Sequence, residues 1–433
     1  MIGRASILTY GCQMNEADSS DIGLALREAG YGLTSAWEQA DLVVLNTCAI
    51  REKAEDRIKG TLGQLRAVRA KRPWLVVGVM GCMAAQSSEY LEREADFVIP
   101  PLAAGKLPEV LAGLPPPPGV GEEAGDLPPL QMEQETEFKR YLPIIRGCDY
   151  RCTFCVVPNT RGPEMNEPAE PLLAAVDRMS GAGVLEITLL GQTVNAYRHG
   201  EWDFARLLET MARRHPHVSF RFLTSHPRDF TDRVIEAMAS NANVMPYLHL
   251  PLQSGSDKIL RRMKRLYSVS EYLAVIERAR AAIPTLAVST DIICGFPGET
   301  EEDFELTLEA VRRLRYDSAF MFYYSERPGT PAVKLGDKIP VQVRKERLAR
   351  LIEVQKAIQH EVNQRDVASE QRCLVERVSR RDPEVMLART PGNKSLLVRA
   401  PRSTIGSYQR VRIERADSFT LYGEISFQPI SAP

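Results

Sequence analysis

Short apolar runs alternate with longer amphipathic stretches over the first 114 residues. The apolar runs predict strands at 6–10, 41–46, 74–80 and 96–99. Helical periodicity between them predicts helices, for example over 16–29 and 51–69. Regular alternation of strand and helix indicates a parallel sheet with helices on its faces, because parallel strands need a crossover connection.

A linker at 115–133 follows, rich in proline, glycine and acidic residues. The strand–helix alternation then resumes within 134–364, which we predict to be one domain. Its predicted strands lie at 142–147, 185–190, 218–223, 247–252, 286–293 and 318–324. Six such units predict a partial (β/α)6 barrel, three quarters of the eight-unit type.

The last part of the chain changes to a period of two. A charged helix is predicted over 341–368, and five short strands follow within 365–430. These strands predict a small antiparallel β-barrel of OB-like type. The fold class is therefore α/β, with an N-terminal parallel α/β sheet domain at 1–114, a central partial barrel and a C-terminal β-barrel.

Charge and composition narrow the class of protein. The 433 residues are 44% hydrophobic and 26% charged, with a net charge of −1, which excludes a globally basic nucleic-acid binder. Residues 365–433 carry 12 basic and 8 acidic residues, a local charge of +4. A positive patch suits contact with RNA phosphates, and a solvated charged surface is an equally good interpretation.

The chain has no run long enough for a membrane helix and no secretory signal at its start. We therefore expect a cytoplasmic protein without a membrane partner. In that reducing compartment, eight cysteines favour metal or redox roles over disulfides.

Three of the cysteines, Cys148, Cys152 and Cys155, follow the strand predicted at 142–147 with the spacing C-x3-C-x2-C. Three thiolates can hold three corners of an iron–sulfur cluster and leave one iron open, as in reactive metal sites. Structural zinc is the alternative, but it requires a fourth Cys or His ligand and none lies near in sequence.

A second set of cysteines lies in the N-terminal domain. Cys12, Cys48 and Cys82 each come just after a predicted strand, 36 and 34 residues apart. The carboxyl ends of parallel strands share one edge, so we predict a second cluster with three protein ligands there. Buried cysteines packed as small hydrophobes are the alternative, which we favour for Cys294 and Cys373.

The C-x3-C-x2-C loop, with Phe154 before its last cysteine, resembles the radical S-adenosylmethionine (SAM) enzymes. In that family SAM chelates the open iron, and reduction of the cluster cleaves SAM to a 5′-deoxyadenosyl radical. The resemblance implies cofactor contacts at Phe154, at Gly191 and Gln192 after the second barrel strand, and at Ser289 and Asp291 on the fifth. Turn and capping roles are the alternative for the last four.

Over nearly its whole length the chain resembles the methylthiotransferases of this superfamily, most closely the MiaB type. The matching stretches are TYGCQMNEADS, NTCAIREKAEDRI, VMGCMA, RGCDYRCTFCVVPNTRG, LLGQTVNAY, HLPLQSGSDKILRRMKR, STDIICGFPGETEEDF and YYSERPGTPA. The resemblance implies a methylthiotransferase domain, a radical SAM core and a C-terminal RNA-binding TRAM domain. It also implies two 4Fe-4S clusters and SAM as cofactors, with no catalytic side chain beyond the cluster ligands.

The expected reaction is transfer of a methylthio group to carbon 2 of the N6-dimethylallyl-adenosine 3′ of the anticodon. The expected partners are the anticodon stem-loop of tRNA and an electron donor such as flavodoxin or ferredoxin, and we expect a monomer. Alternative substrates are threonylcarbamoyl-adenosine in tRNA and a ribosomal protein side chain. A non-catalytic iron–sulfur protein that binds RNA is the alternative from another class.

Overall fold

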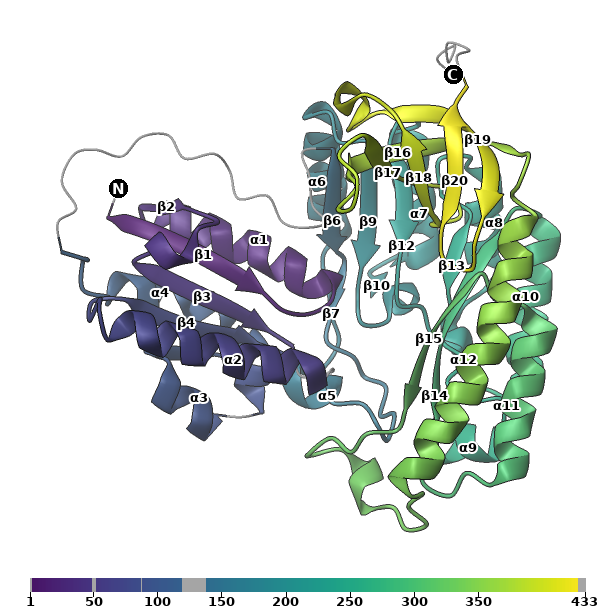
Figure 1. The fold of residues 1–433 in the computed structure, drawn as a ribbon, viewed down its shortest axis with the longest axis horizontal. Helices are drawn as coiled ribbons and strands as arrows, with labels where there is room; N and C mark the ends of the chain where they lie inside the picture. Colours follow the sequence, from purple (N-terminus) through teal and green to yellow (C-terminus); the bar gives the residue numbers. More distant parts are fainter. Residues whose placement is uncertain (1, 49–51, 87, 119–137, 427–433) are drawn as a thin grey trace. The chain divides into compact units, whose positions relative to one another are not determined.

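The computed structural model describes residues 2–48, 52–86, 88–118 and 138–426 (Figure 1). Most of the predicted linker, 115–133, lies outside these ranges. The chain forms two compact units. The first unit comprises Met1–Tyr150, Cys155–Met165 and Leu190–Gln192, and the second unit comprises Arg151–Phe154, Asn166–Leu189 and Thr193–Pro433. The three-domain division drawn from the sequence stays a prediction.

The first unit is built on a five-stranded parallel sheet of order β2-β1-β3-β4-β5. Its strands are β1 (Gly3–Thr9), β2 (Tyr31–Leu33), β3 (Leu42–Thr47), β4 (Val76–Gly81) and β5 (Phe97–Ile99). The four predicted strands are confirmed. The sequence pattern missed the edge strand β2, because three residues are too few to establish a period.

Helices cover both faces of this sheet (Figure 1). They are α1 (Gln13–Glu28), α2 (Glu52–Arg69), α3 (Ser88–Glu94) and α4 (Leu107–Ala112). Leu26 and Leu111 belong to the core on the α1 and α4 face, and Leu62 and Leu91 belong to the core on the α2 and α3 face. Apolar packing on both faces explains why β3 is buried at every position.

Shorter elements precede and follow the cysteine loop. They are β6 (Lys139–Pro143), which belongs to the first unit, and β7 (Ile145–Arg146), α5 (Val157–Thr160) and β8 (Met165–Asn166). The strand predicted at 142–147 is therefore divided, with β6 ending at Pro143 and β7 beginning at Ile145.

The second unit contains the other strands of the predicted barrel. These are β9 (Glu186–Leu190), β12 (Ser219–Phe222), β13 (Tyr247–His249), β14 (Ala287–Cys294) and β15 (Ser318–Tyr323), with the hairpin β10 (Arg198–His199) and β11 (Trp202–Asp203). Their helices are α6 (Ala169–Gly181), α7 (Phe204–Arg214), α8 (Asp232–Ser240), α9 (Asp257–Arg262), α10 (Val269–Ala282) and α11 (Glu301–Leu314).

The barrel strands are parallel but do not form one continuous sheet. β12 pairs with β9, and β14 pairs with β13 and β15. Between the two sheets, the described residues show a single bridge, Phe220 to Val244. β13 ends at His249, three residues before the predicted end, because Pro251 has no N–H for the ladder.

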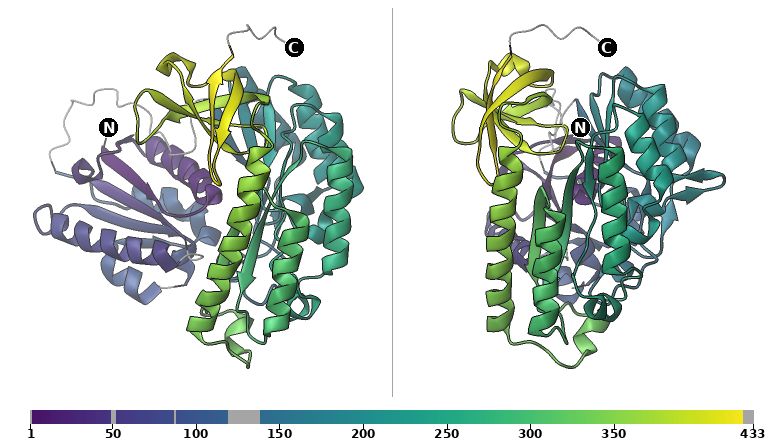
Figure 2. Two further views of the ribbon diagram at one scale, coloured as in Figure 1. Left: turned by 45° about the vertical axis from the view of Figure 1, so that its right-hand side comes forward. Right: turned by 90° about the vertical axis from the view of Figure 1, so that its right-hand side faces the viewer.

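The C-terminal part is a closed five-stranded barrel of order β16-β17-β18-β20-β19, as predicted, but β18 and β20 pair in parallel, whereas the other neighbouring strands are antiparallel as expected. Helix α12 (Val341–Gln364) leads into it along α11 and β15 (Figure 2). The strands are β16 (Glu370–Val378), β17 (Val385–Arg389), β18 (Ser395–Arg399), β19 (Tyr408–Ala416) and β20 (Leu421–Ile425). Cys373 is fully buried in the barrel core and Cys294 is fully buried in β14, which fits the packing roles predicted for them.

The C-terminal barrel is anchored at the amino ends of the parallel strands. Arg221 on β12 donates from Nε to Glu186 on β9 at 2.7 Å, and its two Nη atoms donate to the carbonyls of Thr390 and Pro391 at 2.9 and 2.8 Å. Lys394 contacts Asp317, just before β15, at 2.9 Å. The barrel therefore lies at the opposite end of the second unit from the carboxyl ends of the strands.

Candidate active site

The three N-terminal cysteines lie at one edge of the first unit's sheet. Cys12 precedes α1, Cys48 follows β3 and Cys82 follows β4. The strands they follow are direct neighbours, with Thr9 opposite Asn46 and Thr47 opposite Gly81. Cys48 and Cys82 are buried and Cys12 is partly exposed. The predicted convergence of three strand ends is confirmed, and the ligand role of the cysteines stays a prediction.

A buried amide network ties these strand ends together. Asn15 Nδ2 donates to Asn46 Oδ1 and to the Thr47 carbonyl, each at 3.0 Å. Asn46 Nδ2 returns a bond to the Asn15 carbonyl at 2.7 Å, and the Cys12 thiol donates to Asn15 Oδ1 at 3.4 Å. Our sequence reasoning missed both asparagines, although a polar residue at the end of a fully apolar strand was the available signal.

Gly81 allows the close approach of β4 to β3 at this edge. Its φ is +93°, and an added Cβ would lie 2.4 Å from the Thr47 carbonyl oxygen. A side chain cannot be accommodated there without moving β3. The crevice next to Cys48 and Cys82 therefore depends on glycine at this position.

Arg161 brings a buried positive charge to the same crevice. Its Nη2 donates to Asp18 Oδ2 at 2.7 Å, and Arg146 Nη1 donates to Asp18 Oδ1 at 2.6 Å. Burial raises the pKa of the Cys82 thiol, and the Arg161 charge opposes that rise. Burial works to lower the pKa of Arg161, but Asp18 and Cys82 outweigh it and raise that pKa, so the guanidinium stays charged.

Within the first unit, backbone N–H groups hold the C-x3-C-x2-C loop by hydrogen bonds. The Cys148 N–H donates to the Gly162 carbonyl at 3.1 Å, and the Val157 N–H donates to Cys155 Sγ at 3.4 Å. Gly147 has a φ of +75°, and an added Cβ would lie 1.9 Å from the Pro163 carbonyl oxygen. The loop can close in this way only with glycine at 147.

Cys152 belongs to the second unit, where a buried arginine contacts it. Arg265 Nη1 donates to Cys152 Sγ at 3.3 Å, and its Nε donates to the Tyr267 hydroxyl at 3.1 Å. Burial and the nearby Arg265 lower the pKa of His226 to about 2, so this imidazole is neutral. Arg265 places a positive charge beside Cys152. Our sequence reasoning missed it because nothing in the local pattern marks an arginine as buried.

The predicted cofactor contacts have different environments. Phe154 packs edge-on against Phe296, with ring centroids 6.5 Å apart. Gln192, next to Gly191, has a buried amide oxygen with no hydrogen-bond partner among the described residues. A buried acceptor of this kind suits a donor on a bound ligand, such as an amine.

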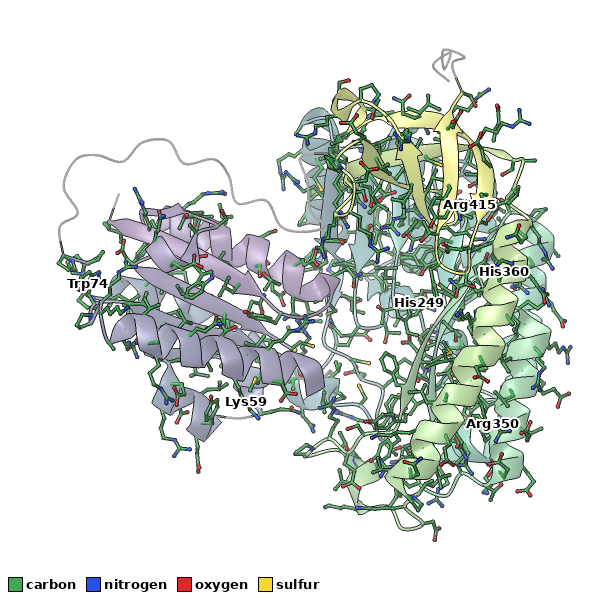
Figure 3. The ribbon with its side chains drawn as sticks, viewed as in Figure 1. Lys59, Trp74, His249, Arg350, His360 and Arg415 are labelled. Carbon is green, nitrogen blue, oxygen red and sulfur yellow. The ribbon has the colours of Figure 1, made fainter. Side chains whose placement is uncertain are left out.

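Ser289 and Asp291 lie on β14 and share its face. The Ser289 hydroxyl is buried and engaged by the Tyr247 hydroxyl at 2.7 Å and by His249 Nδ1 at 2.8 Å. His249, labelled in Figure 3, places Nε2 3.5 Å from Asp291 Oδ1. Asp291 is half-buried, so it is the more accessible of the two candidates.

Gln253 is a further candidate that our sequence reasoning missed. Its φ is +71°, a strained conformation for a residue with a side chain, and its amide oxygen is buried with no partner in the described ranges. Its N–H donates to the Asp291 carbonyl at 2.9 Å, which places Gln253 beside β14. Strain of this kind cannot be read from sequence.

The donor set fits iron–sulfur clusters. The predicted ligands are all thiols, no disulfide joins any of the eight cysteines, and N–H groups of Val157 and Arg265 point at two of the sulfurs. Such hydrogen bonds are typical of cluster ligands. Within the described residues, no three Cys, His, Asp or Glu side chains are arranged to hold a metal ion.

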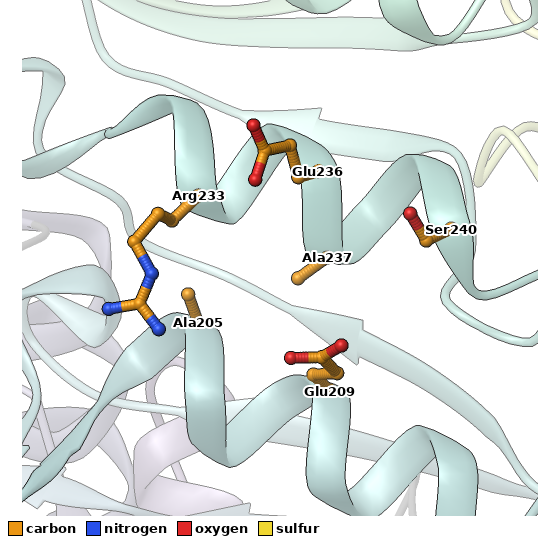
Figure 4. Close-up of a pocket in the computed structure, with 6 residues that line it drawn as sticks. All are labelled: Ala205, Glu209, Arg233, Glu236, Ala237 and Ser240. Carbon is orange, nitrogen blue, oxygen red and sulfur yellow. The ribbon is translucent and has the colours of Figure 1, made fainter.

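A pocket on the second unit lies away from all of these residues. It is found between α7 and α8 on the outer side of the barrel strands (Figure 4). Its lining consists of Ala205, Glu209, Arg233, Glu236, Ala237 and Ser240. None of them is a predicted site residue, so the pocket is not part of the candidate site.

In the described ranges no helix has the length and apolarity needed to cross a bilayer.

The fold and the cysteine loop define a radical SAM enzyme. Residues 142–311 match the Radical SAM superfamily, residues 4–99 match the Uncharacterized protein family UPF0004, and residues 364–426 match the TRAM domain. A radical S-adenosylmethionine methyltransferase, TsrM from Kitasatospora setae, has a similar fold. It has a TM-score of 0.55 at 13% identity, covering 73% of this chain and 72% of that one.

Curated relatives identify the family. The tRNA-2-methylthio-N(6)-dimethylallyladenosine synthase of Dictyoglomus thermophilum is 40% identical over 97% of this chain and 98% of its own length. The enzyme of the same name from Symbiobacterium thermophilum is 41% identical over 99% of this chain and 95% of its own. The chain belongs to the family of tRNA-2-methylthio-N(6)-dimethylallyladenosine synthases.

Proposed function

We propose that this protein transfers a methylthio group to carbon 2 of N6-dimethylallyladenosine in tRNA. The observation that carries this proposal is the meeting of three strand-end cysteines at one sheet edge, in a chain that also has the C-x3-C-x2-C loop. Two separate sets of three thiols suit one cluster for radical formation and another for the sulfur that is transferred. The enzyme uses two 4Fe-4S clusters and SAM.

Each cysteine set has a distinct role in this proposal. Cys148, Cys152 and Cys155 hold the cluster that binds SAM, and Cys12, Cys48 and Cys82 hold the auxiliary cluster. When bound, these groups and SAM supply the radical and methyl-transfer chemistry, while the protein positions and shields them.

The side chains at the carboxyl ends of the barrel strands are proposed to contact SAM. The buried amide oxygen of Gln192 is an acceptor for the SAM amine, and Arg265 offsets the negative charge beside Cys152. Phe154, Gly191, Ser289 and Asp291 complete the proposed SAM contacts.

Nucleoside mass spectrometry tests the function directly. Deletion of the gene should remove 2-methylthio-N6-dimethylallyladenosine from total tRNA and leave unmodified N6-dimethylallyladenosine in its place. Expression of the intact chain should restore the nucleoside. Retention of this nucleoside in the deletion strain, with loss of a methylthio-threonylcarbamoyl-adenosine instead, would assign the enzyme to the alternative tRNA substrate.

The proposed partner is the anticodon stem-loop of tRNA, because a base in a single-stranded loop can be turned out into a pocket. Reduction of the SAM cluster requires an electron donor, for which we propose flavodoxin or ferredoxin. We also propose that the enzyme acts as a monomer in the cytoplasm, where its tRNA substrate is located.

The C-terminal barrel offers a place for RNA phosphates. Arg372 on β16 lies directly opposite Arg410 on β19, and both side chains are exposed. Neither forms an ion pair with any described residue, whereas their neighbour Arg412 lies between Glu370 and Glu424. Like charges placed directly opposite each other destabilise a sheet, so a bound phosphate at Arg372 and Arg410 would relieve the repulsion.

Replacing both Arg372 and Arg410 with Gln should weaken tRNA binding about tenfold at moderate salt and reduce the salt slope by about 1 to 2. The measurement is fluorescence anisotropy of labelled tRNA over a salt series. Arg412→Gln is the matched control, and it should have a smaller effect because two carboxylates already offset this charge. Equal losses in the two variants would contradict this assignment of the RNA surface.

A further inference from the structure

Arg161 is a buried cation that comes from outside the N-terminal sheet. It lies six residues after Cys155, and its side chain is only 6% exposed. Its N–H donates to the Val157 carbonyl at 2.8 Å, and Gly162 turns the chain immediately afterwards with a φ of +76°. The short helix α5, which ends just before Arg161, packs against the turn at Cys82–Ala85 and places the arginine beside Cys82.

Asp18 is shared by Arg161 and Arg146, so its carboxylate is divided between two guanidinium groups. Arg146 also reaches Asp21, whose side chain is 69% exposed. The buried Arg161 charge acts on Cys82 and Cys12, both of which interact electrostatically with it.

This crevice needs positive charge once its thiols are deprotonated. Cys48 is 2% exposed and Cys82 is 3% exposed, so water does little to stabilise thiolates there. An uncompensated buried anion is costly, and each further anion in the crevice adds to that cost. Arg161 is held where it can offset the cost.

We propose that Arg161 is a positioning residue whose charge stabilises the anionic auxiliary site and strengthens its binding of a small anionic sulfur ligand, hydrosulfide or an alkylthiolate. The inference rests on the proposed function, in which Cys12, Cys48 and Cys82 hold a cluster with one open iron. It adds a link between the two sites, because the loop of one cluster supplies the charge for the other.

The test uses the full-length chain with Cys148, Cys152 and Cys155 replaced by Ala, so that only the auxiliary cluster forms. Two quantities are measured by electron paramagnetic resonance: the midpoint potential of the cluster and the Kd of methanethiolate. Arg161→Gln should lower the potential and weaken methanethiolate binding about tenfold. Arg161→Lys should lie between the parent and the Gln variant, since it keeps the charge and loses the fork geometry.

Arg146→Gln is the matched comparison, because it removes the same unit of charge from the other side of Asp18, on a side chain that is more exposed than that of Arg161. It should lower the potential and weaken methanethiolate binding less than Arg161→Gln does, and equal effects in the two variants would overturn the proposal. A parent-like potential and Kd in Arg161→Gln would overturn the proposal. If that variant does not fold, Asp18→Asn replaces it. Removing that carboxylate should raise the potential, and an unchanged or lower potential overturns the proposal equally.

Failure of the proposed function would look different. A parent chain that takes up no iron at Cys12, Cys48 and Cys82 would overturn both the auxiliary cluster and this role for Arg161. A parent with about four irons, combined with Arg161 variants that behave like it, would overturn the role of Arg161 alone.

Discussion

Replacing Cys12 with Ala should reduce the iron content from about eight to about four per chain and abolish methylthio transfer. The variant should still cleave SAM reductively, because the loop of Cys148, Cys152 and Cys155 is untouched. Cys152→Ala should give the same iron content but lose both activities. The two variants thus separate radical formation from sulfur delivery.

Iron is counted after anaerobic reconstitution, 5′-deoxyadenosine reports SAM cleavage, and nucleoside mass spectrometry reports transfer. Cys373→Ala is the control, since Cys373 is fully buried in the core of the C-terminal barrel and far along the chain from both cysteine sets. It should retain about eight irons and both activities. Methylthio transfer by the Cys12 variant would refute the role given to the auxiliary site.

Replacing Arg221 with Ala should destabilise the protein by about 3–5 kcal/mol, because it removes one member of a buried ion pair and leaves the negative charge of Glu186 less compensated. The two side chains are only 6% and 2% exposed, and Arg221 also holds the Thr390 and Pro391 carbonyls of the C-terminal barrel. The second unit should therefore lose both a buried ion pair and the attachment of its barrel.

Urea denaturation followed by circular dichroism measures the effect. Arg415→Ala is the control, since Arg415 is an exposed barrel arginine stacked on Tyr422 and should cost less than about 1 kcal/mol. Arg221→Met combined with Glu186→Leu should recover the part of the loss that comes from the buried charge, but not the part that comes from the Thr390 and Pro391 carbonyls, because methionine has no hydrogen-bond donor. A loss below 1 kcal/mol in Arg221→Ala would show that the ion pair does not anchor the barrel.

The order of strands and helices could be predicted because it follows from short-range patterns. Strand ends at Thr9, Thr47 and Gly81 could be placed, and parallel topology then brought Cys12, Cys48 and Cys82 to one edge. The break between β12 and β13 could not be predicted from the sequence, because strand pairing depends on tertiary contacts that a period-two pattern does not encode.

The side chains around the cysteines were the harder part of the site. Arg161 and Arg265 look like surface arginines in the sequence, and only the fold buries them beside Cys82 and Cys152. The amides of Asn15 and Asn46 form a hydrogen bond although they are 31 positions apart in the chain, and local sequence patterns do not predict contacts over that separation. Supporting residues of this kind emerge only when distant segments meet.

The position of the C-terminal barrel sets the distance that a bound RNA must span. The barrel lies at the amino ends of the parallel strands, whereas Cys152 lies near their carboxyl ends. Strand β14, eight residues long, separates the two by roughly 26 Å. On the proposed function, an RNA bound by the barrel must span at least this distance to bring its base to the cluster, so the enzyme selects substrates by length. A hairpin with too short a stem could bind the C-terminal barrel or place its base at the cluster, but it could not do both at once.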